Sequence, residues 1–286
     1  MPPISPIPIL GNVKFFGAGL QLPTKEWSEK YYKDRKQESG DQGNPPNTIS
    51  PWFKAPHMGY KYQQDSVDKI GKNFKDFHDA MIDAVKFAHS MWKLQAKFKD
   101  LKINAITALG TPGCLDGPEL ESLIKNAPSC AAFMGNMQKH RDAVAKGVSK
   151  CFKEWQDKVM VPGLPWYPAF AAFPGPMAAP VPNLPTPLIA CPSAMMAKIV
   201  APTDMAKAMD DALDNGMKDK DKGKQYEALH SAIATVLSLA FLLWLPQQQV
   251  MLVLGKGPIP TFAPPFVPIG PVVMGENIAL PGHLMA

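Results

Sequence analysis

The chain has 286 residues, 30 basic and 25 acidic side chains, a formal net charge of +5 and 31 prolines. This length allows one large or two small domains with a sizeable core. The small positive charge is too weak to indicate nucleic-acid binding by itself. The N-terminus lacks a basic segment followed by an unbroken apolar run, so no secretory signal peptide is expected.

The cysteines indicate neither a zinc site nor secretion. None of them belongs to a C-x-x-C pair, which makes zinc unlikely on spacing alone. An even number permits disulfides, but nothing else in the sequence indicates an oxidising compartment, so reduced core thiols are favoured. The four positions are Cys114, Cys130, Cys151 and Cys191.

Residues 1–64 predict an extended N-terminal arm. Proline, glycine and asparagine interrupt the segment throughout, and 37–47 is a polar loop. Aromatic residues such as Trp27 and Trp52 flank that loop, whereas a disordered tail rarely contains so many aromatics. We therefore expect the arm to dock on a protein surface.

Residues 65–160 predict a long helical hairpin. Apolar residues from Val67 to Trp92 recur at steps of three and four, the spacing of one helix face, and no proline interrupts them. A helix of ~40 residues at ~1.5 Å per residue would be about 60 Å long. The same spacing from Phe133 to Val159 predicts a second helix. Two amphipathic helices with a short connector are typical of an antiparallel hairpin.

Residues 161–202 predict a proline-rich apolar strap, and 203–254 predict a second helical block. The first part of the strap, 161–193, contains no charged residue. Within the block, one helix is expected to begin at Thr203, and another is expected from Tyr226 to Leu245 before Pro246.

Residues 255–286 predict a second proline-rich strap. Proline lacks an N–H and fixes φ, which excludes it from helix interiors and from the middle of a sheet. The strap is nevertheless apolar, and burying one such side chain stabilises by about 1.5–3 kcal/mol. We expect it to lie along the chain's own helices or on a neighbouring subunit, so that removing 257–286 leaves a helical protein unable to assemble. The candidate partner-binding residues of the two straps are Trp166, Phe170, Phe173, Phe262, Phe266, Val267, Ile269, Val272 and Val273.

These segments together predict a mainly α fold. It consists of a long amphipathic helical hairpin and a second helical block, with extended proline-rich apolar arms at the N- and C-termini and little β structure.

No pattern of residues indicates a catalytic, cofactor or metal site. Glu227 and His230 stand at i and i+3, as in one half of a di-iron carboxylate site, but no second copy of the motif exists and a helix-surface pair is favoured. Asp76, Asp79 and Asp83 alternate with lysines, which indicates a solvated helix face. We therefore predict no catalytic residues, no metal and no cofactor.

The sequence favours a non-enzymatic structural subunit of a large assembly in a virion or the cytoplasm. A virion or a phage-tail-like particle, such as a baseplate or contractile injection machine, is the preferred setting, with other protein subunits as partners, an oligomeric state and no specific nucleic acid. The alternative is a membrane-active or translocated effector that inserts 226–254. Its apolar core, 232–245, is shorter than the roughly 18–20 residues a span needs, which favours a buried helix. An enzyme built from scattered residues stays open.

Overall fold

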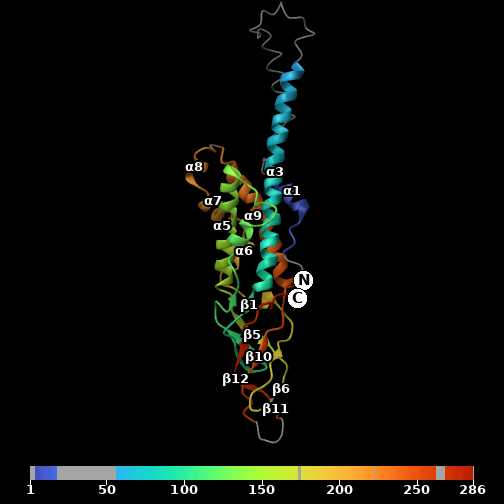
Figure 1. The fold of residues 1–286 in the computed structure, drawn as a ribbon, viewed down its shortest axis with the longest axis vertical. Helices are drawn as coiled ribbons and strands as arrows, with labels where there is room; N and C mark the ends of the chain where they lie inside the picture. Colours follow the sequence, from blue (N-terminus) through green and yellow to red (C-terminus); the bar gives the residue numbers. More distant parts are fainter. Residues whose placement is uncertain (1–3, 18–55, 173–174, 222, 262–267, 286) are drawn as a thin grey trace, which may run out of the picture.

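Helices and strands occupy opposite ends of an elongated molecule (Figure 1). The computed structural model describes residues 4–17, 56–172, 175–221, 223–261 and 268–285. The chain is about 49% helical and 20% strand. The prediction of a mainly α fold with little β structure is therefore wrong.

The unpredicted element is a curled antiparallel sheet, a half-barrel, with the strand order β5-β3-β2-β12-β10-β7. In that order the strands are β5 (Val161–Pro165), β3 (Thr107–Gly110), β2 (Lys102–Ala105), β12 (Val272–Ile278), β10 (Leu254–Lys256) and β7 (Val181–Pro182). Strands β5, β7 and β12 come from the segments predicted as straps.

The position of each proline explains how these segments enter a sheet. Pro162 and Pro165 lie in β5, and Pro182 lies in β7, the two strands at the edges of the sheet order. An edge strand tolerates a residue without an N–H, whereas a central strand does not. β12 begins directly after Pro271 and contains no proline, and it lies between β2 and β10. Removing 257–286 would therefore take out a central strand rather than a peripheral strap.

Trp166 draws the two edges of the half-barrel together. Its indole Nε1 donates a hydrogen bond to the Val181 carbonyl oxygen of β7 at 3.0 Å. The Leu184 backbone N–H, just after β7, donates to the Pro165 carbonyl oxygen of β5 at 2.9 Å. The side chain of Trp166 is 2% exposed, so it fills the inside of the curled sheet.

Short strand pairs flank the half-barrel. β1 (Lys97–Phe98) pairs with β4 (Leu115–Asp116), β6 (Phe170–Ala171) pairs with β11 (Ile269–Gly270), and β8 (Thr186–Pro187) pairs with β9 (Gln249–Val250). All of these pairs are antiparallel.

The described helices form a bundle. They are α1 (Pro8–Gly17), α3 (Pro56–Gln95), α4 (Leu120–Lys125), α5 (Gly135–Gln156), the 3-10 turn η1 (Leu188–Ala190), α6 (Ala197–Val200), α7 (Pro202–Ala212), α8 (Asn215–Lys218) and α9 (Gln225–Gln247). The predicted length of the first long helix is confirmed, because α3 has 40 residues. The two helices of the expected hairpin, α3 and α5, contact each other only weakly. Instead, α5 packs chiefly against α7 and α4, and α7 packs against α9. In Figure 1, α3 projects beyond the other helices.

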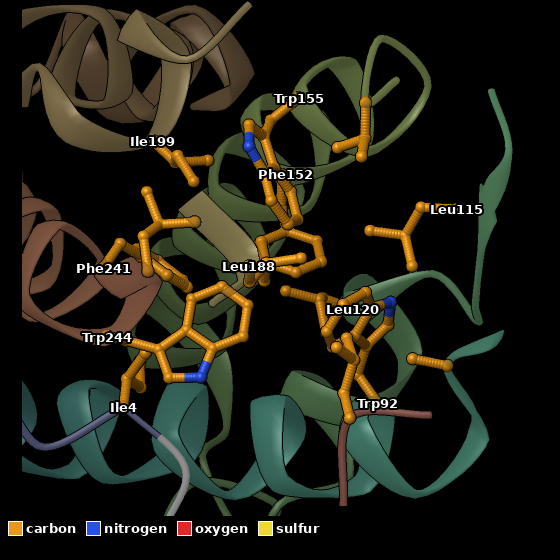
Figure 2. Close-up of a cluster of buried hydrophobic side chains, with 14 of the residues drawn as sticks. Ile4, Trp92, Leu115, Leu120, Phe152, Trp155, Leu188, Ile199, Phe241 and Trp244 are labelled. Carbon is orange, nitrogen blue, oxygen red and sulfur yellow. The ribbon is translucent and has the colours of Figure 1, made fainter. Parts of the chain in front are cut away.

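An aromatic cluster forms the centre of the bundle (Figure 2). Trp92 of α3 lies edge-on to Phe152 of α5, with ring centroids 4.8 Å apart, and 6.2 Å from Trp244 of α9. His89 lies edge-on to Trp244 at 4.5 Å. Aromatic pairs contribute about 0.5–1.5 kcal/mol each beyond the burial of their area. The cluster therefore joins helices from three distant parts of the sequence.

Gly147 permits the closest contact between α5 and α7. A Cβ at this position would lie 2.6 Å from the Met209 backbone nitrogen and 2.7 Å from its Cα. Backbone atoms cannot move aside as a flexible side chain can. A larger residue at 147 would therefore force the helices apart.

We predict that Gly147→Ala lowers the free energy of unfolding by about 1–3 kcal/mol, because it overpacks this contact. In an exposed helix the same change is favourable by about 1 kcal/mol. Gly71→Ala on α3 is the matched control, since nothing lies within 4 Å of its added Cβ. Urea unfolding followed by circular dichroism measures both variants. Equal stabilisation by both changes would contradict the close contact.

Candidate interaction surface

The predicted partner-binding residues fall into three groups. Those outside the described residues are Phe173, Phe262, Phe266 and Val267. Those buried by the chain itself are Trp166, Phe170 and Val272. Those exposed are Ile269 and Val273, at 71% and 41%. Among the described members of this set, the exposed pair alone is accessible to a partner in this conformation, and partner binding by all of these residues stays a prediction.

Three further apolar side chains are exposed on segments that pair with or adjoin those of the exposed pair. These segments belong to the half-barrel, at the end of the molecule opposite the helices (Figure 1). Met274 is 81% exposed, Ile106 48% and Tyr167 46%. We call this surface the apolar tip; it consists of Ile106, Tyr167, Ile269, Val273 and Met274. The sequence analysis missed Ile106, because it gave the β2–β3 turn to a helical segment. Tyr167 and Met274 lie in the predicted straps but were not among the residues named there as candidates.

Backbone hydrogen bonds hold the parts of the apolar tip together. The Trp166 N–H donates to the Ile106 carbonyl oxygen at 2.8 Å, which places Tyr167 beside the β2–β3 turn. The Met274 N–H donates to Asn104 Oδ1 at 2.9 Å. The neighbouring Ala172 N–H donates to the Pro268 carbonyl oxygen at 3.1 Å, next to Ile269. The apolar tip thus combines segments that lie far apart in the sequence.

Charged residues are excluded from the segments that build the apolar tip. Residues 103–108, 161–193 and 257–275 contain none. The first charges along β2 and β12 are Lys102 and Glu276, which form an ion pair at 2.8 Å. A surface that exposes large apolar side chains without charge is typical of an interaction site.

The backbone at the apolar tip is strained. Ala105 has φ 52° and Met274 has φ 57°, both in the left-handed region that glycine favours. This conformation costs other residues roughly 1–2 kcal/mol each. Such strain gathers at functional sites, where a particular side-chain orientation is needed. Here it accompanies Met274, the most exposed side chain of the surface.

The structure separates the residues of the metal motif considered from the sequence. Glu227 pairs with Lys224 at 3.0 Å, whereas His230 Nδ1 hydrogen bonds with Asp210 Oδ1 at 2.7 Å. On α3, Asp76 and Asp79 pair with lysines one turn earlier, as a solvated face would. Among the described residues, no group of three or more His, Cys, Asp and Glu side chains could hold a metal ion.

The cysteine thiols are buried and form no disulfide. Burial raises the pKa of Cys114 and of Cys151 to about 11 and that of Cys191 to about 12. A thiol reacts as its thiolate, so these side chains are poor nucleophiles at neutral pH.

Helix α9 is the one described helix long and apolar enough to cross a membrane. Its mean hydropathy is 2.0 over the best window, of which 67% is buried inside the protein. The central helix of a bundle meets the same criterion, so length and composition alone do not favour insertion. Phe241 and Trp244 of α9 belong to the aromatic cluster (Figure 2).

Buried histidines are the second feature that the sequence analysis missed. Each has one buried ring nitrogen without a hydrogen-bond partner in the described structure: Nε2 of His78, His89, His230 and His283, and Nδ1 of His140. Two of them fasten backbone segments: His89 Nδ1 accepts a hydrogen bond from the Ile4 N–H at 3.2 Å, and His283 Nδ1 accepts one from the Phe98 N–H at 2.8 Å. The position of His78 and His89 within the apolar stripe of α3 is the signal that predicts their burial.

Burial keeps several of these rings neutral, because it disfavours the charged form. Burial, with a smaller contribution from nearby Lys93, lowers the pKa of His89 to about 3. It likewise lowers the pKa of His140 to about 4 and that of His283 to about 4. The pKa of His78 is also lowered by burial, which outweighs the opposing effect of Asp79.

Comparison with protein-family models, with curated proteins and with solved structures finds no match to this chain.

We predict that the free energy of unfolding falls as pH drops from about 6.5 to about 4. In the unfolded chain, protons bind near the ordinary pKa of 6.5 to the four histidines whose pKa the fold lowers, whereas the folded chain resists their protonation; the four are His78, His89, His140 and His283. Acid therefore favours the unfolded state, by up to ~1.4 kcal/mol per pH unit for each histidine. Urea unfolding at pH 7, 6, 5 and 4 measures the slope.

His89→Gln and His283→Gln provide the control, since each removes one titrating group. Each should lower the slope of the free energy of unfolding against pH by the amount that one bound proton contributes, about 1.4 kcal/mol per pH unit. The fold lowers the pKa of the Asp79 and Glu276 carboxyl groups from their ordinary values of 3.8 and 4.5. Their contribution to the free energy of unfolding is therefore lost only as the pH falls below those values. A free energy of unfolding that stays constant between pH 6.5 and 4.5 would contradict the neutral, buried rings.

Proposed function

We propose that this chain is a non-enzymatic structural subunit of a large multi-protein assembly, which it joins by inserting the apolar tip into a neighbouring protein. The observation that supports the proposal is the exposure of apolar side chains on an uncharged, strained end of an elongated molecule. A narrow end fits a concave pocket better than a broad, flat interface.

The chemistry of the apolar tip favours an apolar pocket as its binding site. Burying one large apolar side chain stabilises by about 1.5–3 kcal/mol. The surface has no charged group to desolvate, so none of this free energy is lost on removing a charge from water. Met274 adapts to an irregular pocket because its side chain is unbranched, and Tyr167 adds a hydroxyl that can hydrogen bond at the rim.

A virion or phage-tail-like particle, including its baseplate, is the setting we propose. Elongated subunits with an apolar end suit particles in which each chain contacts several others. Proline-rich segments support this use, because their restricted backbone loses less entropy when it docks.

Membrane insertion of 226–254 is the weaker proposal. Helix α9 supplies Phe241 and Trp244 to the aromatic cluster, so moving this helix into lipid would dismantle the core of the bundle.

We predict that Met274→Asp prevents incorporation into the native particle while leaving the fold intact. A carboxylate buried in an apolar pocket without a partner costs more than ~1.4 kcal/mol, which weakens binding at least about tenfold. Aspartate also tolerates the left-handed backbone better than methionine does. Density-gradient sedimentation of tagged full-length chains from the native source measures the particle-bound fraction.

Met134→Asp is the matched control, because Met134 is also 81% exposed but lies at the N-cap of α5, where aspartate is favourable. This variant should sediment with the particle like the wild type. Wild-type chain that sediments only as a monomer would overturn the assembly role. Normal incorporation of Met274→Asp would overturn the role of the apolar tip.

A further inference from the structure

The described N-terminal segment is attached to the bundle at its two ends. We call residues 4–15 the N-terminal strap. Ile4 and Phe15, its end residues, are 0% and 1% exposed. Between them, Ile9 and Val13 are 74% and 59% exposed. The strap therefore docks through its two ends and through Leu10 and Gly11, and it leaves Ile9 and Val13 exposed.

The strap occupies a groove between α3 and α9. The Ile4 N–H donates to His89 Nδ1, and the ring of Phe15 packs 5.5 Å from the ring of His78. Both histidines belong to α3. At Gly11 the strap comes close to both helices, since a Cβ there would lie 3.3 Å from His78 Cε1 and 3.9 Å from Val236 Cγ2 of α9.

The strap fills this groove incompletely. A cleft of about 380 Å³ remains beside it. One side of the cleft is lined by the strap, including Pro6, Ile7 and Asn12, and the other by charged residues of α3, including Lys75 and Lys86. With Ile9 and Val13 left in solvent, the strap buries less apolar surface than a helix in the centre of the bundle does. The strap is therefore less firmly held than the helices of the bundle.

The chain order gives the strap a long connection to the rest of the molecule. Residues 18–55 separate α1 from Pro56, the first residue of α3. Pro56 lies at the end of α3 that projects from the bundle (Figure 1). The helix from Pro56 to His78 is ~33 Å long at ~1.5 Å per residue. A connection of this many residues spans at most about 120 Å, so it can reach a second molecule as well as its own groove.

We propose that the N-terminal strap exchanges between copies, so that the groove between α3 and α9 binds residues 4–15 of a neighbouring copy. This inference rests on the proposed function and names one partner, a second copy of the chain. Exchange forms the same anchor contacts, Ile4 with His89 and Phe15 with His78, in another molecule. Swapping an identical element costs little because it creates no new interface chemistry.

Local concentration decides between the two arrangements. A strap joined to its own α3 through residues 18–55 meets its own groove at an effective concentration of about millimolar. A dilute molecule therefore keeps its own strap. In a particle, where copies are packed side by side, the groove of a neighbour competes on equal terms.

Cysteines placed across the groove test the exchange. Gly11→Cys marks the strap and Val236→Cys marks α9, at positions that are adjacent in the docked arrangement. The two single variants, carrying different tags, are co-expressed as full-length chains, concentrated to about millimolar so that a neighbouring groove competes with the chain's own, and oxidised. Only a strap from one copy in the groove of the other brings these two cysteines together. The described native cysteines are buried and should not compete.

The expected result is a disulfide-linked heterodimer of twice the 31.2 kDa chain mass on a non-reducing gel. Adding Ile4→Asp to the Gly11→Cys chain removes an anchor and should reduce the heterodimer about tenfold. The double variant Gly11→Cys/Val236→Cys reports docking within one chain. Internal closure of the double variant without any heterodimer from the co-expressed chains would overturn the exchange.

This experiment detects contact between two copies and changes no residue of the apolar tip, so its result is independent of the test of the proposed function. Suppose that no heterodimer forms but Met274→Asp fails to join the particle, as predicted above. That result would reject the exchange and keep the assembly role. If the heterodimer forms but the chain joins no larger particle, the exchange is kept and the assembly role is rejected.

Discussion

Burial of the aromatic cluster between α3, α5 and α9 is the interaction on which the rest of the structure depends. Trp92, Phe152 and Trp244 come from helices that are distant in sequence, and their rings bring those helices together. His89 lies within the same cluster and supplies the acceptor for the N-terminal strap. Packing in the bundle thus positions the groove, and the groove positions the strap.

The long helices could be predicted from the sequence, whereas the sheet could not, and neither could α1, which lies in the segment predicted as an extended arm. An apolar residue every three or four positions identifies a helix such as α3 locally, without knowledge of its neighbours. Strand β12 follows a proline-rich stretch, and its pairing with β2 joins Lys102 to Glu276 across a separation of 174 residues. Proline density therefore hid a central strand, and the apolar tip that depends on this pairing was only partly identified, through Ile269 and Val273.

The two surfaces proposed for assembly differ in how they meet a partner. The apolar tip is fixed to the sheet by the pairing of β2 with β12 and by the hydrogen bond from the Met274 N–H to Asn104 Oδ1. The N-terminal strap is anchored at Ile4 and Phe15 and is connected to α3 through residues 18–55. A fixed tip suits recognition of another protein, and a tethered strap suits linkage to an identical one. Together they would let one subunit bind a different protein through the apolar tip and an identical copy through the N-terminal strap.

The prolines of β5 and β7 have a further consequence for a protein that exposes so much apolar surface. A free sheet edge is a template on which other chains add strands and aggregate. Pro162, Pro165 and Pro182 interrupt the row of donors at these edges, and Trp166 ties the edges to each other. The molecule can therefore be crowded at high concentration without uncontrolled edge-to-edge polymerisation, so association is left to its side-chain surfaces.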